Sequence, residues 1–442
     1  MVYIFNMVIK MKRDFYDVLM DWKNNNVLTP LMVVGARQVG KTYIIDDFCK
    51  NNFSDYIYVN LLNNKRIVDI FAANKNILDK IKDFKLELNR EITLDTILFV
   101  DEVQESEDFI KALKFFQETD FPYKIITAGS LLGVKLKRFH KSFPVGKVMI
   151  SYMYPMSFKE FLIAIGKNDF IPLIRECYHD NKPMDEVFHQ ELLRDYRSYL
   201  CTGGMPASIK DYLDCNQELS VNLHNVLRSI IDSYLADMNK YTNNVYESNK
   251  IEKIYQNIPN QLAKENKKYQ FSKLNKNARF RDYEMSFEWL LSSKLIIPNY
   301  FVNCFETPLK AFMDENVFKL YLSDVGFLTE LLSIPYNRIV LDDDFMFKGV
   351  LAENYVATEL VKNNFSLFYY QKPQVMELDF IIDTADGVIP IEVKAGSRVK
   401  STSLNKFMVQ EQLPMGIRIS NKNFDFENNI KSVPLYAVFC IK

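Results

Sequence analysis

The string GARQVGKT, at residues 35–42, constrains the fold of this 442-residue chain more than any other feature. It matches the pattern G-x-x-x-x-G-K-[S/T] in full, follows the apolar run Leu31–Val34 and precedes a helical pattern. In this strand–loop–helix context the glycines let several backbone N–H groups turn toward phosphate oxygens. The N-terminus of the following helix adds a dipole that favours an anion. The string therefore predicts an α/β domain that binds a nucleoside triphosphate.

The side chains of this loop have separate expected roles. Lys41 would reach the β- and γ-phosphates, and the Thr42 hydroxyl would be a ligand of Mg²⁺. The alternative, a glycine-containing turn with an idle lysine, is disfavoured by the flanking strand and helix. The residues expected to contact ATP are Gly35, Ala36, Arg37, Gln38, Val39, Gly40, Lys41, Thr42 and Tyr43.

Two polar strand ends support a triphosphate site. The apolar run Ile97–Val100 ends in Asp101 and Glu102. We expect Asp101 to hold the Mg²⁺ shell and Glu102 to polarise a water for attack on the γ-phosphate. A later strand pattern ends at Ser130, which could touch the γ-phosphate or the attacking water, or could simply cap a helix. An ordinary strand that ends in a charged turn is the alternative for Asp101 and Glu102.

The surrounding pattern indicates a multidomain α/β protein with a parallel sheet. Short apolar runs separated by helical patterns are typical of parallel strands that are covered on both faces. They lie at residues 31–34, 56–61, 97–100, 124–128 and 147–154, and a helical region follows from 157 to about 240. Hydrophobic residues make up 48% of the chain and charged residues 25%, which excludes a chain that is disordered throughout.

Cellular location can be argued only from indirect features. The six cysteines are scattered and form no C-x-x-C pair, which fits a reducing cytoplasm better than a disulfide framework. The sequence contains no stretch of 18 apolar residues, so we expect no membrane span. We therefore expect a cytoplasmic protein, and a homo-oligomer remains open.

A basic segment, defined here as residues 264–281, contains seven Lys or Arg residues and one acidic residue, in a chain of net charge −1. Its cations are Lys264, Lys267, Lys268, Lys273, Lys276, Arg279 and Arg281, and its aromatic residues are Tyr269, Phe271 and Phe280. Because phosphate contacts dominate nucleic-acid affinity, this segment predicts binding to nucleic acid, with DNA as the first choice. A solvated face and a docking face for an acidic protein are the alternatives.

Carboxylates gather in the last hundred residues. On a strand, residues i and i+2 share a face, so Glu377 and Asp379 should point together, as should Glu392 and Lys394. Oxygen ligands of this kind suit Mg²⁺ or Mn²⁺, and a bound cation could activate water against a phosphodiester, with Lys394 neutralising developing charge. The alternative is a solvated amphipathic strand.

The order of the motifs resembles that of a family of bacterial and archaeal AAA-type ATPases. The matching segments are GARQVGKT, LFVDE, ITAGSLLG, YPMSFKEFL, YLCTGGMPAS, residues 258–296, FKLYLSDVGFL and KGVLAENYVATEL. The resemblance implies an ATPase core at 1–156, a helical lid at 157–242, a winged-helix-like module at 243–335 and a PD-(D/E)xK nuclease-like domain at 336–442. In this signature, Glu353, Asp379 and Glu392 would bind metal, and Asp379, Glu392 and Lys394 would be catalytic.

One departure concerns the arginine finger. Related sequences often have Gly-Arg where this chain has Gly146-Lys147, and lysine cannot fork across a phosphoryl group as arginine does. Arg138 is a nearby candidate, with a plain surface charge as the alternative.

Three hypotheses follow from the sequence. The first is an ATPase that acts on nucleic acid and carries a metal-dependent nuclease. The second is a nucleotide-dependent switch whose C-terminal half only binds DNA or a protein. The third, a remodeller of other proteins, lacks an evident aromatic substrate loop and is ranked last.

Overall fold

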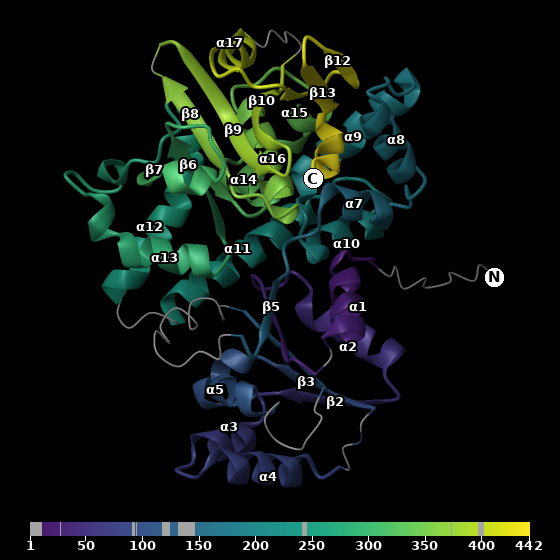
Figure 1. Cartoon of the computed structure of the whole chain (residues 1–442), viewed down its shortest axis with the longest axis vertical. Coiled ribbons are helices and arrows are strands. Elements are labelled where there is room, and N and C mark those ends of the chain that lie inside the picture. The colour runs from purple at the N-terminus through teal and green to yellow at the C-terminus, as the bar shows by residue number, and fades with distance from the viewer. Residues whose placement is uncertain are drawn as a thin grey trace. The chain divides into compact units, whose positions relative to one another are not determined.

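The structure is a computed structural model that describes residues 11–26, 28–90, 93, 95–116, 124–130, 146–240, 245–372, 374–396 and 402–442. The described chain divides into two compact units (Figure 1). Residues 12–154, together with 292–294, form an N-terminal unit, and residues 155–291 and 295–442 form a C-terminal unit. A finer division at residues 242 and 335 stays a prediction.

The N-terminal unit is built on a five-stranded parallel sheet of order β2-β3-β4-β1-β5. Its strands are β1 (Leu31–Val34), β2 (Asp55–Asn60), β3 (Thr96–Asp101), β4 (Lys124–Gly129) and β5 (Met149–Tyr152). Strands β1 and β3 are buried along their whole length, as continuous apolar runs in a sheet covered on both faces should be. The predicted parallel α/β sheet is confirmed.

Helices cover this sheet and are fixed by apolar packing. They are α1 (Phe15–Asn25), α2 (Lys41–Asn52), α3 (Lys65–Ala72), α4 (Ile77–Leu88) and α5 (Glu107–Phe116), with a 3₁₀ turn at Val103–Glu105. Phe71, Phe84 and Phe109 join α3, α4 and α5 edge-to-face, with 4.9 Å between the Phe71 and Phe109 ring centroids. Such aromatic pairs contribute beyond their buried area.

The C-terminal unit begins with helices, as the pattern after residue 157 predicts. These are α7 (Phe158–Ala164), α8 (Phe170–Asp180), α9 (Glu186–Thr202), α10 (Pro206–Asp214), α11 (Asn222–Lys240), α12 (Val245–Leu262) and α13 (Glu284–Ser292). Later helices are α14 (Val325–Leu331), α15 (Tyr336–Val340), α16 (Lys348–Lys362) and α17 (Thr402–Gln410). Short 3₁₀ turns lie at Phe271–Lys273, Phe280–Asp282, Leu309–Phe312 and Leu435–Cys440.

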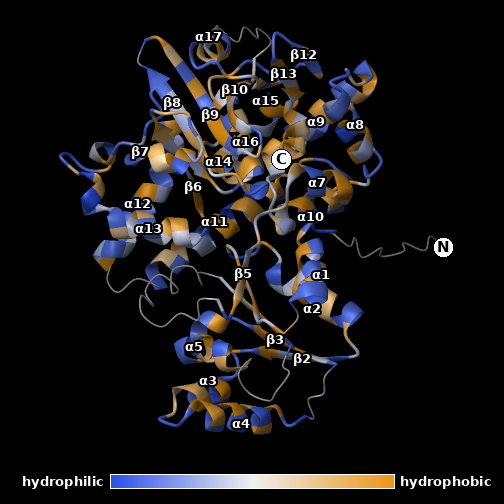
Figure 2. Ribbon diagram, in the orientation of Figure 1, coloured by the Kyte–Doolittle hydropathy of each residue, from blue (hydrophilic) through white to orange (hydrophobic). Residues whose placement is uncertain are grey.

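A mixed eight-stranded sheet forms the core of this unit, with the order β12-β13-β11-β10-β9-β8-β6-β7. Its strands are β6 (Ile296–Val302), β7 (Met313–Leu322), β8 (Phe368–Lys372), β9 (Met376–Thr384), β10 (Gly387–Lys394), β11 (Gly416–Ser420), β12 (Asp425–Glu427) and β13 (Ile430–Pro434). The β6–β7 hairpin, which the sequence places with the basic segment, continues the C-terminal sheet because β6 pairs with β8. Hydrophobic residues are frequent along β3 in the N-terminal unit and along β9 in the C-terminal unit (Figure 2).

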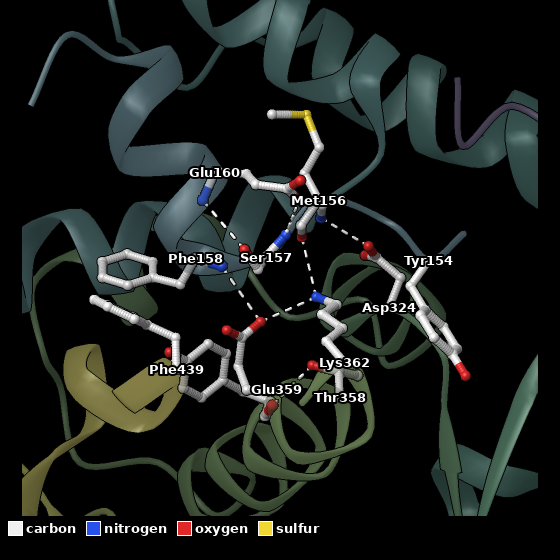
Figure 3. Close-up of polar contacts among 12 residues, drawn as sticks. Tyr154, Met156, Ser157, Phe158, Glu160, Asp324, Thr358, Glu359, Lys362 and Phe439 are labelled. Carbon is white, nitrogen blue, oxygen red and sulfur yellow. Dashed lines mark hydrogen bonds and ion pairs between the residues drawn. The ribbon is translucent and has the colours of Figure 1, made fainter. Parts of the chain in front are cut away.

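The first residues of the C-terminal unit are held by a buried polar cluster. Ser157 caps α7 in a capping box with Glu160. Glu359 and Lys362, both from α16, reach the backbone at Met156 and Phe158 (Figure 3). The Glu359 carboxylate accepts hydrogen bonds from Phe158 N–H at 3.3 Å and from Lys362 Nζ at 3.0 Å. Burial raises the pKa of Glu359, against the pull of the Lys362 ammonium.

Asp324 fixes the turn after α9 in the same unit. Its carboxylate accepts the Gly204 N–H at 2.7 Å and the Gly326 N–H at 2.8 Å. Gly203 has φ +65°, and a Cβ there would lie 1.9 Å from Asp324 Oδ1. The segment TGGMPAS therefore needs glycine at residue 203 for both its backbone conformation and its close packing.

No described helix is long and apolar enough to cross a bilayer.

We predict that Gly203→Ala destabilises the protein by roughly 2–4 kcal/mol, because backbone strain adds to a steric clash. Gly166→Ala is the matched control, since Gly166 also has positive φ (+83°) but nothing lies within 4 Å of its added Cβ. The control should cost only about 1 kcal/mol. Thermal unfolding of the two variants measures the difference, and equal shifts would contradict the packing argument.

Candidate functional site

The phosphate loop is shaped by its neighbours in the N-terminal unit. It leaves β1 at Gly35, where a Cβ would lie 2.3 Å from the Met153 carbonyl oxygen. Gln38 and Gly40 both have positive φ, at +63° and +93°. These left-handed residues turn the chain into α2, which begins at Lys41. The predicted strand, loop and helix thus follow one another directly.

Lys41 is enclosed by the loop. Its side chain is buried, and Nζ donates to the Gly35 carbonyl at 3.0 Å and to the Ala36 carbonyl at 2.8 Å. Burial lowers the pKa of Lys41 to about 8, although the carboxylates of Glu102 and Asp101 favour its charged form. The ammonium is therefore held at the centre of the loop, where phosphate oxygens would give it stronger partners.

The expected magnesium residues meet across two neighbouring elements. Thr42 Oγ1 donates a 2.8 Å hydrogen bond to Asp101 Oδ2, from the end of β3. The other oxygen, Asp101 Oδ1, accepts the Glu102 N–H at 2.9 Å. Tyr58 OH lies 3.3 Å from Oδ2 and completes the shell around this carboxylate. A hydroxyl and a carboxylate are the donor set that Mg²⁺ uses beside a phosphate loop.

Glu102 and Ser130 stand at the same edge of the sheet. The strand order places the carboxyl ends of β3, β4 and β1 side by side, and these ends carry Asp101, Ser130 and the loop. Glu102 has a left-handed backbone (φ +54°) and accepts a hydrogen bond from the Gln104 amide. Ser130 is buried, and its hydroxyl has no hydrogen-bond partner within the described ranges. An unsatisfied buried hydroxyl fits a partner supplied by a ligand.

Two further predictions concern Tyr43 and Arg138. Tyr43 is 50% exposed on α2, so its predicted contact with nucleotide stays a prediction. Arg138, the candidate arginine finger, lies outside the described residues.

Arg13 is a loop-supporting residue that sequence reasoning missed. It is buried, and its guanidinium donates to the Val39 carbonyl and to the Tyr154 carbonyl, both at 2.7 Å. It therefore ties the phosphate loop to the chain segment that follows β5. No motif surrounds Arg13, so only the spatial return of that segment to the loop identifies it.

The C-terminal carboxylates come together as the strand pattern predicts. Glu353 on α16, Asp379 on β9 and Glu392 on β10 are all buried. Strands β9 and β10 pair at Phe380 and Ile391, which brings Asp379 next to β10, where its Oδ2 accepts the Val393 N–H at 2.8 Å. With Glu377, these residues are called the carboxylate cluster below.

Three lysines neutralise this cluster. Lys394 Nζ lies 3.0 Å from Glu392 Oε1, which confirms that the two share a face. Lys319, on β7, is 1% exposed and pairs with Glu377 at 2.6 Å. Lys267, from the basic segment, forms an ion pair with Glu353. Neither Lys319 nor the inward turn of Lys267 was predicted.

The pKa shifts reflect this dense packing of charge. Burial, followed by the nearby Glu353 carboxylate, raises the pKa of Asp379 to about 7. Burial opposes ionisation of Glu353 as well, but the ammonium groups of Lys267 and Lys319 hold its pKa below the usual value. Lys267 has a raised pKa, because its carboxylate partners outweigh its burial.

A metal does not fit the cluster in this arrangement. Among the described residues, no group of three or more His, Cys, Asp or Glu side chains is placed to hold a metal ion. Instead, one carboxylate oxygen of each of Glu353, Glu377 and Glu392 is paired with a lysine ammonium group. The metal and catalytic roles expected for Glu353, Asp379, Glu392 and Lys394 therefore stay predictions.

The basic segment combines a buried apolar side with an exposed charged side. Tyr269 and Phe271 are buried and pack against Phe318. These aromatic residues are therefore core residues. The segment contains two short 3₁₀ turns and no α-helix that could enter a groove. Its exposed cations are Lys264, Lys273, Lys276, Arg279 and Arg281.

Comparisons with known proteins match separate parts of the chain. Residues 28–162 match the model of an AAA domain. Residues 193–338 and 348–438 match two domains of unknown function, DUF8612 and DUF4143. No curated protein matches the chain.

Solved structures also match parts of the chain, at low sequence identity. The Walker-type ATPase PABY2304 of Pyrococcus abyssi is 14% identical, with 73% of this chain and 96% of that chain covered and a TM-score of 0.41. The ORC2 protein of Aeropyrum pernix, in ADPNP-ADP complexes, is 13% identical, with 75% and 94% covered and a TM-score of 0.35. Domain III of the replication initiation protein DnaA from Thermotoga maritima is 14% identical, with 49% and 90% covered and a TM-score of 0.26.

The domain match, together with the loop geometry, carries the assignment. The matched range includes the phosphate loop, Asp101, Glu102 and Ser130. Residues 28–162 therefore form an AAA-type P-loop ATPase domain.

Proposed function

We propose that the protein binds and hydrolyses ATP and couples this cycle to action on nucleic acid, with DNA as the first choice. The observation that carries the proposal is the link between Thr42 and Asp101 beside the buried Lys41. It places a cation, a hydroxyl and a carboxylate at the end of a phosphate loop, which is the donor set for a magnesium–triphosphate.

Each residue at this edge of the sheet would have its own role. Lys41 and the backbone N–H groups of residues 35–42 would hold the phosphates, and Thr42 and Asp101 would hold Mg²⁺. The metal, when bound, would neutralise charge on the β- and γ-phosphates. Glu102 would accept a proton from an attacking water, and the unsatisfied Ser130 hydroxyl would orient the γ-phosphate or that water.

The nucleic-acid part of the proposal rests on the exposed cations of the basic segment. Five of its seven Lys and Arg side chains are exposed, while its buried aromatic residues anchor it to β7. Cationic side chains on an ordered segment can contact successive phosphates of a nucleic acid. A winged-helix-like module over residues 243–335 is part of this proposal, with α12, α13 and the β6–β7 hairpin as its elements. A cytoplasmic location is also proposed, since all six cysteines are free thiols.

A nuclease is the second candidate function, and the C-terminal strand order favours it. Helix α16 precedes the meander β8–β9–β10, and α17 then leads to β11 parallel to β10. Three carboxylates from α16, β9 and β10 are buried together in this frame. Lysine ammonium groups pair with Glu353 and Glu392 in this arrangement, so no metal-dependent step is part of the proposal. The alternative is a C-terminal half that only binds DNA or a protein, without cleavage.

We predict that Lys41→Ala lowers ATP binding and turnover by at least about 100-fold, because the loop loses its central cation. Glu102→Gln should bind ATP within a few-fold of wild type but lose roughly 100-fold or more in turnover. Lys50→Ala, an exposed position on the same helix, is the control and should change neither. Phosphate release and nucleotide titration measure both quantities, and normal turnover in Lys41→Ala would contradict the proposal.

We predict that DNA affinity falls with salt at a log–log slope of roughly −4 to −5, as expected for five phosphate contacts. The double variant Lys273→Ala/Lys276→Ala should reduce the magnitude of the slope by about 2. Lys210→Ala, an exposed lysine on α10, should leave the slope unchanged. Fluorescence anisotropy at several salt concentrations measures it, and equal slopes for all three proteins would exclude the basic segment as the contact.

A further inference from the structure

Lys267 differs from the other two lysines of the carboxylate cluster in its place on the chain. Lys319 lies within strand β7 and Lys394 within β10, so both are fixed by the sheet. Lys267 lies between the end of α12, at Leu262, and the 3₁₀ turn that begins at Phe271. It therefore reaches Glu353 from a loop of the basic segment, close to the exposed Lys264.

The surroundings of Lys267 are strongly acidic. Glu353, Asp379 and Glu377 all act electrostatically on its ammonium group. The cluster as a whole has four carboxylates and three ammonium groups. With all four carboxylates ionised and Lys267 absent, two more negative than positive charges would remain, which is the excess that one divalent cation neutralises.

A second observation indicates that the cluster has capacity for a ligand. Glu392 is 2% exposed, and its Oε2 has no hydrogen-bond partner among the described residues. A buried carboxylate oxygen without a partner is costly and fits a cation or a donor that arrives from outside. An open groove of about 360 Å³, lined in part by Glu265 and Asn266, borders the cluster at Glu377.

We propose that Lys267 is a tethered cation that stands where the carboxylate cluster would hold a divalent metal, so that the cluster takes up a metal only when Lys267 is withdrawn. The inference deepens the second candidate function, since it concerns the regulation of the same site. Phosphate groups that engage the basic segment would compete with Glu353 for this loop and supply the withdrawal.

Metal binding by the full chain tests the proposal, with Mn²⁺ as the probe and no nucleotide present. Isothermal titration calorimetry and the electron paramagnetic resonance signal of Mn²⁺ should give the same number of Mn²⁺ sites for wild type and Asp379→Asn. Lys267→Met should gain one Mn²⁺ site, which should bind at least about tenfold more tightly than any site at the cluster in wild type. The double variant Lys267→Met/Asp379→Asn should lack this site. Lys268→Met, at the neighbouring half-buried lysine, should behave as wild type.

Two results would overturn the proposal. One is a Mn²⁺ site in wild type that Asp379→Asn removes, and the other is a folded Lys267→Met protein that gains no site. Lys267→Gln, which keeps a hydrogen-bond donor beside Glu353, replaces Lys267→Met if thermal unfolding shows that the latter does not fold. If neither variant folds, wild type and Asp379→Asn are compared with DNA present, and the lack of a Mn²⁺ site that Asp379→Asn removes then overturns the proposal. DNA that stays uncut in every lane would reject the nuclease but leave this inference standing.

Discussion

The hydrogen bond between Thr42 and Asp101 is the interaction on which the N-terminal unit's chemistry depends. It joins the first turn of α2 to the end of β3, so it forms only when the parallel sheet brings these carboxyl ends to one edge. The sheet in turn needs the continuous apolar strands β1 and β3. Glycine at residue 35 lets the loop pass close to the Met153 carbonyl, and Arg13 donates hydrogen bonds to the Val39 and Tyr154 carbonyls. The same contacts therefore pack this edge of the sheet and position its polar side chains.

The C-terminal unit contains several buried carboxylates that need partners. Removing a carboxylate from water is costly unless a cation or several donors replace the solvent. Lysine ammonium groups pair with Glu353, Glu377 and Glu392. Asp324 instead accepts hydrogen bonds from backbone N–H groups. Charge pairs of this kind contribute little net stability over an apolar core, but removing one partner is expensive. Lys267 lies on a loop rather than in a strand, so among these lysines it is the one that could exchange its carboxylate partner for another anion.

Much of the first unit could be predicted from sequence, because its signals are local. The five strands, the phosphate loop and the position of Asp101 at the end of β3 all follow from runs of fewer than ten residues. Features that depend on distant pairing could not be predicted. The β6–β7 hairpin joins the C-terminal sheet through contacts between residues about 70 apart, and Lys267 meets Glu353 across 86 residues. Arg13 and Lys319 lie in no motif, so their partners become visible only in the fold.

The magnesium dependence of ATP binding tests the central claim most directly. Isothermal titration would compare the affinity for ATP with Mg²⁺ and with a chelator, in wild type and in Asp101→Asn. The account predicts that Mg²⁺ tightens ATP binding to wild type and that Asp101→Asn removes most of this gain, because Asp101 positions Thr42 and the metal shell. Lys50→Ala should keep the full gain. An Asp101→Asn protein that binds ATP with undiminished magnesium dependence would contradict the account.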